Sequence, residues 1–184
     1  MKQKNVQITI SGMPGSGKST IAEHLAAGFR LKHYSVGDFM RQLAKKHKVS
    51  LLQLSKEAEK GPKIDKQLDS MTKGLRKKRT FVLDSRLGWY FLPKSIKIFV
   101  KVDVKDAARR IFNQKRGIEK ENLTYRKTLE NIRRRIKSER MRYKRYYGID
   151  IERLSNYDII IDTSGLRIKQ MCFAVEKAVK RLLM

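Results

Sequence analysis

The sequence predicts one α/β domain, with a five-stranded parallel sheet between two layers of helices. Short runs of apolar and mostly β-branched residues recur along the chain, helical segments separate them, and a glycine-rich turn joins the first run to the first helix. Strands that are covered on both faces appear as continuous apolar runs, and helical crossovers join parallel strands. The 184 residues, 40% of them hydrophobic, suffice for one core without disulfides or a structural metal.

Each element follows from a local pattern. A strand at 6–10 leads into the glycine turn, and a helix at 19–27 follows that turn. Ser50 and Gln53 form a capping-box pattern that starts a second helix. Asp103 opens a third helix, whose apolar residues recur at helical spacing. The remaining strands are expected at 32–35, 80–83, 96–102 and 158–162.

The longest helix is expected at 125–147, because Gly148 stops the helical pattern there. At 1.5 Å per residue this helix is about 35 Å long. No internal repeat, linker or low-complexity tract divides the chain, so residues 1–184 are expected to form a single domain.

The chain is strongly basic, with 44 Lys and Arg against 18 Asp and Glu and a net charge of +26. This excess favours polyanionic partners such as nucleotides and RNA. One cluster, the helix flank, consists of Arg126, Arg133, Lys137, Arg140 and Lys144. A second, the 73–79 cluster, consists of Lys73, Arg76, Lys77, Lys78 and Arg79. Each is either a solvated face or a track for non-specific contact with RNA phosphates. No aromatic platform accompanies either cluster in the sequence, which argues against binding of single strands by stacking.

Metal-binding and membrane-spanning patterns are not found in the sequence. The one cysteine, Cys172, lies in an apolar helical stretch, and the three histidines have no partners at ligand spacing. The apolar run near the N-terminus is too short for a signal segment or a membrane span. We therefore expect a cytoplasmic monomer without a membrane partner.

Residues 12–19 read Gly-Met-Pro-Gly-Ser-Gly-Lys-Ser and match G-x-x-x-x-G-K-[ST] in full, between an expected strand and an expected helix. Glycines let the backbone wrap closely around a phosphate, and the helix N-terminus adds a favourable dipole. Lys18 supplies a cation for the β- and γ-phosphates, and Ser19 is placed to bind Mg²⁺. The context predicts a phosphate-binding P-loop in the three-layer fold of P-loop NTPases. ATP contacts are expected from Gly12, Met13, Pro14, Gly15, Ser16, Gly17, Lys18, Ser19 and Thr20.

Binding of Mg²⁺ also calls for a carboxylate. We expect this carboxylate at the end of another strand, where it can reach the ion or its waters. Asp84 follows the apolar run 81–83 and fits this place. Arg86 puts a guanidinium beside that acid, where a planar bidentate donor can hold a second phosphate. Two phosphate-binding sites indicate transfer of a phosphoryl group between two nucleotides rather than simple hydrolysis.

The long helix carries a further set of charged residues. Arg135 and Arg142 are seven residues apart and share one flank of its apolar stripe, with Glu139 between them. We expect Glu139 to orient both guanidiniums or to bond a base. Converging cations suit phosphoryl transfer, because negative charge spreads over the transferred oxygens. The predicted catalytic residues are Lys18, Arg86, Arg135 and Arg142.

Over nearly its whole length the chain resembles the P-loop nucleoside monophosphate kinases, and most closely the archaeal-type cytidylate kinases. The resemblance rests on residues 12–20, on Ser-Val-Gly-Asp-Phe-Met-Arg at 35–41 and on Val-Leu-Asp-Ser-Arg-Leu-Gly-Trp at 82–89. It continues through the spaced residues Arg135, Glu139, Arg142 and Tyr143, Tyr-Gly-Ile-Asp at 147–150 and Tyr-Asp-Ile-Ile-Ile-Asp-Thr at 157–163. The P-loop alone identifies only a superfamily, whereas these other segments are far more specific.

The resemblance implies a division of the chain into three parts. A core is expected at 1–35, 79–113 and 148–184, and an acceptor-binding helical insertion at about 36–78. Residues 114–147 would form the lid and its arms, with a short mobile lid around 116–124.

The resemblance also implies residue roles. Arg41 and Arg86 would hold the acceptor phosphate. Asp65 and Asp69 are both candidates near the acceptor sugar or base, with Asp65 favoured, whereas a solvated helix face is the favoured interpretation for Asp69. The expected acceptor-binding residues are Ser35, Asp38, Arg41, Asp65, Arg86 and Glu139.

The chain departs from the family pattern in the lid. Gln114 and Ile136 stand where relatives tend to have Arg and Glu. These changes bear on lid chemistry and turnover more than on the fold.

The hypothesis that follows is reversible transfer of the γ-phosphoryl group of Mg-ATP to CMP or dCMP. The acceptor phosphate is already largely ionised at pH 7, so no strong general base is required. Two alternatives stay open: the same reaction on AMP or UMP, and a P-loop factor that associates with RNA and has weak kinase or ATPase activity. The sequence also leaves open the choice between ribose and deoxyribose.

Overall fold

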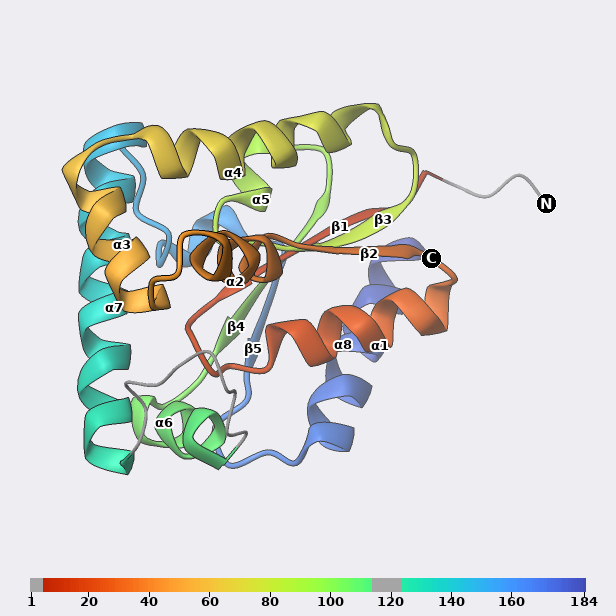
Figure 1. Ribbon diagram of the computed structural model, residues 1–184. Coiled ribbons are helices and arrows are strands. Elements are labelled where there is room, and N and C mark those ends of the chain that lie inside the picture. Colours follow the sequence, from red (N-terminus) through yellow and green to blue (C-terminus); the bar gives the residue numbers. More distant parts are fainter. Residues whose placement is uncertain (1–4, 114–123) are drawn as a thin grey trace.

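The computed structural model describes residues 5–113 and 124–184 and has the predicted α/β architecture (Figure 1). Its sheet has five parallel strands in the order β2-β3-β1-β4-β5. All five predicted strands are confirmed, with ends shifted by at most two residues. Their bounds are β1 Gln7–Gly12, β2 Lys32–Ser35, β3 Phe81–Asp84, β4 Ile96–Lys101 and β5 Ile159–Asp162.

Helices cover both faces of this sheet because its central strands are apolar on both sides. Ile8, Ile10 and Val82 pack into one core with residues of α1 (Lys18–Phe29) and α8 (Ile168–Leu183). Alternate residues of β3 point to the other face, where they meet α5 (Gly88–Phe91) and the C-terminal half of α7 (Tyr125–Tyr147). Figure 1 shows α1 and α8 on one side of the strands and α7 on the other.

Between β2 and β3 the chain forms a helical layer with its own apolar core. It consists of α2 (Val36–Lys46), α3 (Leu51–Lys60), α4 (Lys63–Gly74) and the short 3-10 helix η1 (Leu75–Lys77). The predicted capping box of Ser50 and Gln53 is present at the start of α3. The apolar core formed by α2, α3 and α4 consists of Leu43, Ala44, Leu51, Leu54, Ala58, Ile64 and Leu68.

The long helix α7 has the predicted bounds. Gly148 ends it with a left-handed φ of 70°, and Thr124 caps its other end by accepting a hydrogen bond from the Lys127 N–H. Before it comes α6 (Val104–Asn113), and after it the 3-10 helix η2 (Leu154–Asn156). Apart from Thr124, the expected lid at 116–124 lies outside the described residues, as does Gln114.

Two further sequence expectations concern the described helices. Cys172 is buried in α8, where it packs beside the core. Among the described residues, no helix is both long and apolar enough to cross a membrane.

The register of the parallel strands brings the important loops to one edge of the sheet. Ile10 in β1 lies beside Asp84 in β3, and Gly12 lies beside Val100 in β4. Ser35, at the end of β2, is also opposite Asp84. The turn after β1, the end of β3 and the start of α2 therefore meet at the carboxyl edge, where ligands bind in open α/β sheets.

The helical layer predicts a measurable stability difference. Leu54 is fully buried in its core, so Leu54→Ala is expected to lower the free energy of unfolding by about 3 kcal/mol. Leu182→Ala removes the same atoms from a side chain that is 53% exposed, and it is expected to cost less than about 0.5 kcal/mol. Urea unfolding followed by circular dichroism measures both. Equal losses would mean that α2, α3 and α4 do not pack around Leu54.

Candidate active site

The turn after β1 has the backbone shape of a phosphate-binding loop. Gly12 and Gly15 have backbone φ angles of 138° and 71°, in a region that residues other than glycine rarely adopt. Space demands glycine as well, since a Cβ on Gly12 would lie 2.1 Å from the Val100 carbonyl oxygen and one on Gly15 2.7 Å from that of Ala107. The predicted loop is therefore fixed by its contacts with β4 and α6.

Lys18 begins α1, and its ammonium group bends back to donate to the Met13 carbonyl oxygen at 2.7 Å. Removal of this group from water lowers the pKa of Lys18 to about 7, and the charge of Arg86 acts in the same direction. Asp84 opposes the shift but does not cancel it. The negative charge near the Lys18 ammonium is too small to offset its burial and the charge of Arg86. A phosphate bound beside it would supply the missing negative charge and would therefore bind strongly.

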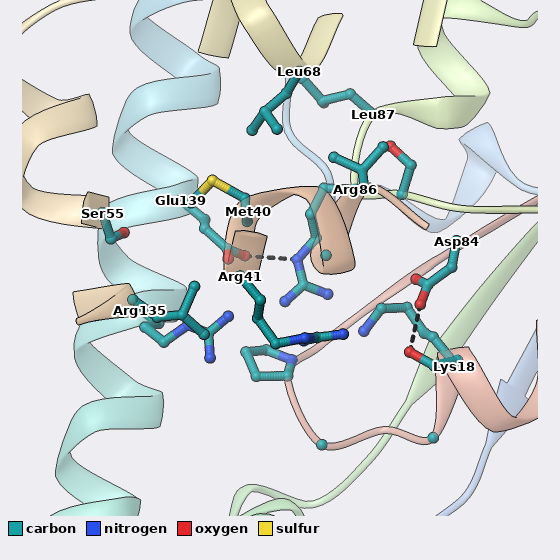
Figure 2. A pocket seen from close by; sticks show the side chains of 18 of the residues that line it. Lys18, Met40, Arg41, Ser55, Leu68, Asp84, Arg86, Leu87, Arg135 and Glu139 are labelled. Carbon is teal, nitrogen blue, oxygen red and sulfur yellow. Dashed lines mark hydrogen bonds and ion pairs between the residues drawn. The ribbon is translucent and has the colours of Figure 1, made fainter. Parts of the chain in front are cut away.

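Ser19 and Asp84 come together as the sequence predicted. The Ser19 hydroxyl donates to Asp84 Oδ2 at 2.6 Å, and Asp84 is buried at the end of β3 (Figure 2). Mg²⁺ prefers oxygen ligands and binds through one or two protein groups together with phosphates and waters. The residues present fit that ion.

Arg86 and Glu139 form a mostly buried ion pair between the turn after β3 and the middle of α7. Arg86 Nε lies 2.7 Å from Glu139 Oε2, with 14% and 11% of the two side chains exposed. Burial by itself raises the pKa of Glu139, but the charges of Arg86 and Arg135 lower it overall. Arg86 Nη1 is buried and has no hydrogen-bond partner among the described residues. Arg86 lines the cavity, so its guanidinium has an unused donor at the cavity wall.

The partner of Glu139 differs from the one expected. The sequence placed Glu139 between Arg135 and Arg142, yet its hydrogen bond goes to Arg86, 53 residues away. Arg142 bonds instead to Asp65 of α4, with Nε 3.1 Å from Oδ2, and both side chains are almost wholly buried. Helical spacing identified the right face of α7 but could not reveal the neighbours that fold onto it.

The Arg142–Asp65 pair joins the helical layer to α7. Arg142 also donates to the hydroxyl groups of Ser55 at 3.0 Å and Ser138 at 2.9 Å. Burial raises the pKa of Asp65, and Arg142 opposes that shift. Asp65 lines the cavity.

The expectation for Asp69 is wrong. Its side chain is buried instead of solvated, and it accepts a hydrogen bond of 2.6 Å from the Tyr147 hydroxyl. It lines the same cavity as Asp65, one turn away on α4. Asp69 was misplaced because the partner that draws it inward belongs to α7.

Ser35 and Asp38 lie beside the cavity and hold the start of α2. The Ser35 hydroxyl accepts a hydrogen bond from the Asp38 N–H and so caps the helix. The Asp38 carboxylate pairs with Arg41, whose side chain lines the cavity. Of these three predicted acceptor residues, Arg41 is the one that faces the cavity.

The cavity has a volume of about 240 Å³ and lies between the P-loop, the helical layer and α7. In Figure 2 the ends of Lys18, Arg41 and Arg86 point toward one space, with Arg135 at its far side. The structure thus brings together every predicted catalytic cation. Lining residues that the sequence did not single out include Met40, Ser55, Leu68, Phe91 and Arg110.

Arg110 of α6 braces the loop after β5 against the P-loop. Its guanidinium donates to the hydroxyl and carbonyl oxygens of Thr163, to the Leu166 carbonyl at 3.2 Å and to the Gly15 carbonyl at 3.5 Å. No local pattern marks Arg110, because its partners come from two other parts of the chain.

Comparisons with known proteins agree with this geometry. A family model described as an AAA domain matches residues 11–145. The cytidylate kinase of Methanothrix thermoacetophila is 38% identical over 85% of this chain and 87% of its own length. That of Sulfurisphaera tokodaii is 34% identical over 92% of each chain. The chain belongs to the archaeal cytidylate kinase family of P-loop nucleoside monophosphate kinases.

Solved structures share the fold of this family member at low sequence identity. An uncharacterized protein from Eubacterium ventriosum has a TM-score of 0.69 at 16% identity, over 95% of this chain and 98% of its own. Shikimate kinase from Acinetobacter baumannii has a TM-score of 0.64 at 13% identity, over 97% of this chain and 95% of its own. These likenesses support the P-loop kinase fold.

The lowered pKa of Lys18 predicts a pH dependence of stability. The unfolded chain keeps this proton up to a pH near 10.5, whereas the folded protein loses it near 7. Between these values the unfolded chain binds more protons, so raising the pH stabilises the fold. Without nucleotide, the free energy of unfolding is therefore expected to rise from about pH 7 to pH 9.5 more steeply than in Lys18→Met. Urea titrations across this range test it, and parallel pH profiles of the two proteins would contradict it.

Proposed function

We propose that this kinase transfers the γ-phosphoryl group of Mg-ATP to CMP or dCMP by in-line displacement. The observation that supports it most is the convergence of the P-loop lysine with Arg41 and Arg86 in one cavity. A nucleotide hydrolase needs one phosphate-binding site, whereas this cavity has a second set of cations, formed by residues outside the P-loop. The relatives described above are named cytidylate kinases.

The donor nucleotide would bind to the P-loop. The backbone of 12–17, the ammonium of Lys18 and the first turn of α1 would hold its phosphates. Ser19 and Asp84 would hold Mg²⁺, which supplies charge neutralisation when bound. Thr20 and the loop braced by Arg110 complete this side of the cavity.

The acceptor phosphate would bind between Arg41 and Arg86. Arg86 offers the unpartnered Nη1, and its pairing with Glu139 fixes the orientation of the guanidinium. Asp38 holds Arg41 from outside the cavity, and Ser35 holds the turn that carries both. The helical layer at 36–78 would then be the acceptor-binding part of the enzyme, and it would move with its substrate.

The base of the acceptor would face the Asp65–Arg142 pair. Cytosine presents an amino group that donates hydrogen bonds, where uracil presents a carbonyl oxygen. A carboxylate accepts from the former and repels the latter. Arg142, predicted to act on the transferred group, is held by Asp65 and Ser55. We therefore assign it to the base side of the site, where it orients Asp65.

Catalysis in this arrangement depends on position and charge. Both reacting groups are anionic phosphates, so the cations must offset their repulsion and hold them in line. Lys18, Arg86 and Arg135 are placed for this task. The acceptor oxygen needs no base, which agrees with a described cavity lining that contains no His or Cys. Closure of the expected lid at 116–124 would exclude water and so prevent ATP hydrolysis.

The function is tested by a coupled assay of ADP formation with CMP, dCMP, UMP and AMP, each with and without RNA. We expect CMP and dCMP to stimulate ADP formation most. Lys18→Ala should lower the turnover number by at least about 100-fold. Lys105→Ala, at an exposed lysine of α6, serves as the control and should keep wild-type turnover. Stimulation by RNA but by no monophosphate would overturn the proposal, and so would near-normal turnover in Lys18→Ala.

The assignment of Asp65 predicts a change in base preference. Asp65→Asn removes the negative charge and adds a donor, so the ratio of kcat/KM for CMP to that for UMP should fall about tenfold. Because the ratio compares two substrates on one protein, loss of folded enzyme does not affect it. The control is Asp69→Asn, the same change one turn along α4, which should leave the ratio within about twofold. An unchanged ratio in Asp65→Asn would place base recognition elsewhere.

A further inference from the structure

The 73–79 cluster lies beside an exposed aromatic side chain, which the sequence did not indicate. Tyr90 of α5 is 43% exposed. Lys73 Nζ lies 4.9 Å from the centre of the Phe91 ring, and Arg76 Nε donates to the Phe91 carbonyl oxygen at 3.0 Å. Both cations are thus anchored on the residue next to Tyr90. No aromatic platform is expected here from the sequence, and Tyr90 is a candidate that this expectation did not consider.

The ring of Tyr90 is held in place before any partner binds. Its centroid lies 6.0 Å from that of Trp89, 5.0 Å from that of Phe91 and 6.2 Å from that of Tyr147, all at steep interplanar angles. An aromatic ring that is already ordered loses little conformational entropy when a base stacks on it. Tyr90 is therefore both accessible and fixed.

Carboxylates neutralise little of the charge around Tyr90, although Asp69 lies close enough to Lys73 for their charges to interact. The five cations of the 73–79 cluster are exposed, and no acidic residue occurs between residues 71 and 80. Within the described part of the chain, none of the five forms a salt bridge. The helix flank differs, because Arg126 pairs with Glu130 and Arg140 with Glu152. Of the two basic clusters, the 73–79 cluster retains more free charge.

We propose that Tyr90 and the 73–79 cluster form a binding surface for single-stranded RNA, outside the catalytic cavity. Cations that track a phosphate backbone beside an aromatic ring on which a base stacks are the usual means of binding single strands. Unstacked bases in loops and at ends are the features of RNA that proteins most often bind in this way. Double-stranded RNA hides its base faces, so it cannot use Tyr90. This surface is independent of the acceptor that the kinase uses.

The aromatic contribution is tested by fluorescence anisotropy with a labelled single-stranded RNA of about 15 nucleotides. Tyr90→Leu is expected to weaken binding about tenfold, because the stacking partner is lost. Tyr90→Trp keeps an aromatic ring and should bind as the wild type does. Tyr125→Leu makes the same change at another exposed tyrosine, the first residue of α7, and should leave the affinity unchanged. CMP kinase activity in each variant reports whether the fold is intact.

The electrostatic contribution is tested by the salt dependence of the same binding. Lys77→Ala/Lys78→Ala removes two phosphate contacts, so the slope of log K against log of salt concentration should become shallower by roughly 1.4. Arg133→Ala/Lys137→Ala removes the same charge from the helix flank and should leave the slope unchanged. Equal effects of the two pairs would show attraction to net charge alone and overturn the proposal. So would equal affinity for the duplex, or an unchanged affinity in Tyr90→Leu. Single-stranded DNA of the same sequence is the further arm, and tighter binding to it than to RNA would contradict the choice of RNA.

Discussion

Several cations must be held close together away from water, and much of the structure serves that constraint. Arg86 and Arg142 would repel nearby cations if each were not paired with a carboxylate. Glu139 of α7 and Asp65 of α4 form these pairs. Among the described residues Lys18 has no such pair, and Asp84 of β3 opposes its repulsion through charge alone. Removal of one member of a buried pair leaves a charge uncompensated, which typically costs about 3–5 kcal/mol. The same pairs therefore assemble the cavity and tie the helical layer to the sheet.

The carboxylates do not fully compensate the positive charge of the site, and the remaining charge and hydrogen-bond donors are suited to binding phosphates. Lys18 keeps a lowered pKa despite Asp84, and Arg86 keeps an unpartnered N–H group. Incoming phosphates supply the missing negative charge and hydrogen-bond acceptors. Donors fixed in advance in a low-dielectric site stabilise developing charge without the cost of reorganisation. The ion pairs thus hold the fold together and preorganise the site for the proposed transfer.

Prediction from the sequence succeeded for features that depend on residues close together in the sequence. The P-loop, the five strands, the capping box at Ser50 and both ends of α7 all follow from local patterns. It failed where a side chain has its partner far along the chain. Asp69 turned inward because of Tyr147, and Glu139 bonded Arg86 instead of its neighbours on α7. Tyr90 was overlooked because it follows the 73–79 cluster by 11 residues, across the buried strand β3.

The sequence by itself determined the α/β class, the position of the phosphate-binding loop and the face of α7 that carries Arg135, Glu139 and Arg142. These features follow from periodicity and from backbone conformations that specific residues impose. Only the tertiary structure decided which carboxylate meets which cation, and which aromatic ring lies beside the surface lysines. A buried charged side chain pairs with the opposite charge that packing places beside it. That partner depends on how β3, α4 and α7 pack together, which no local pattern encodes.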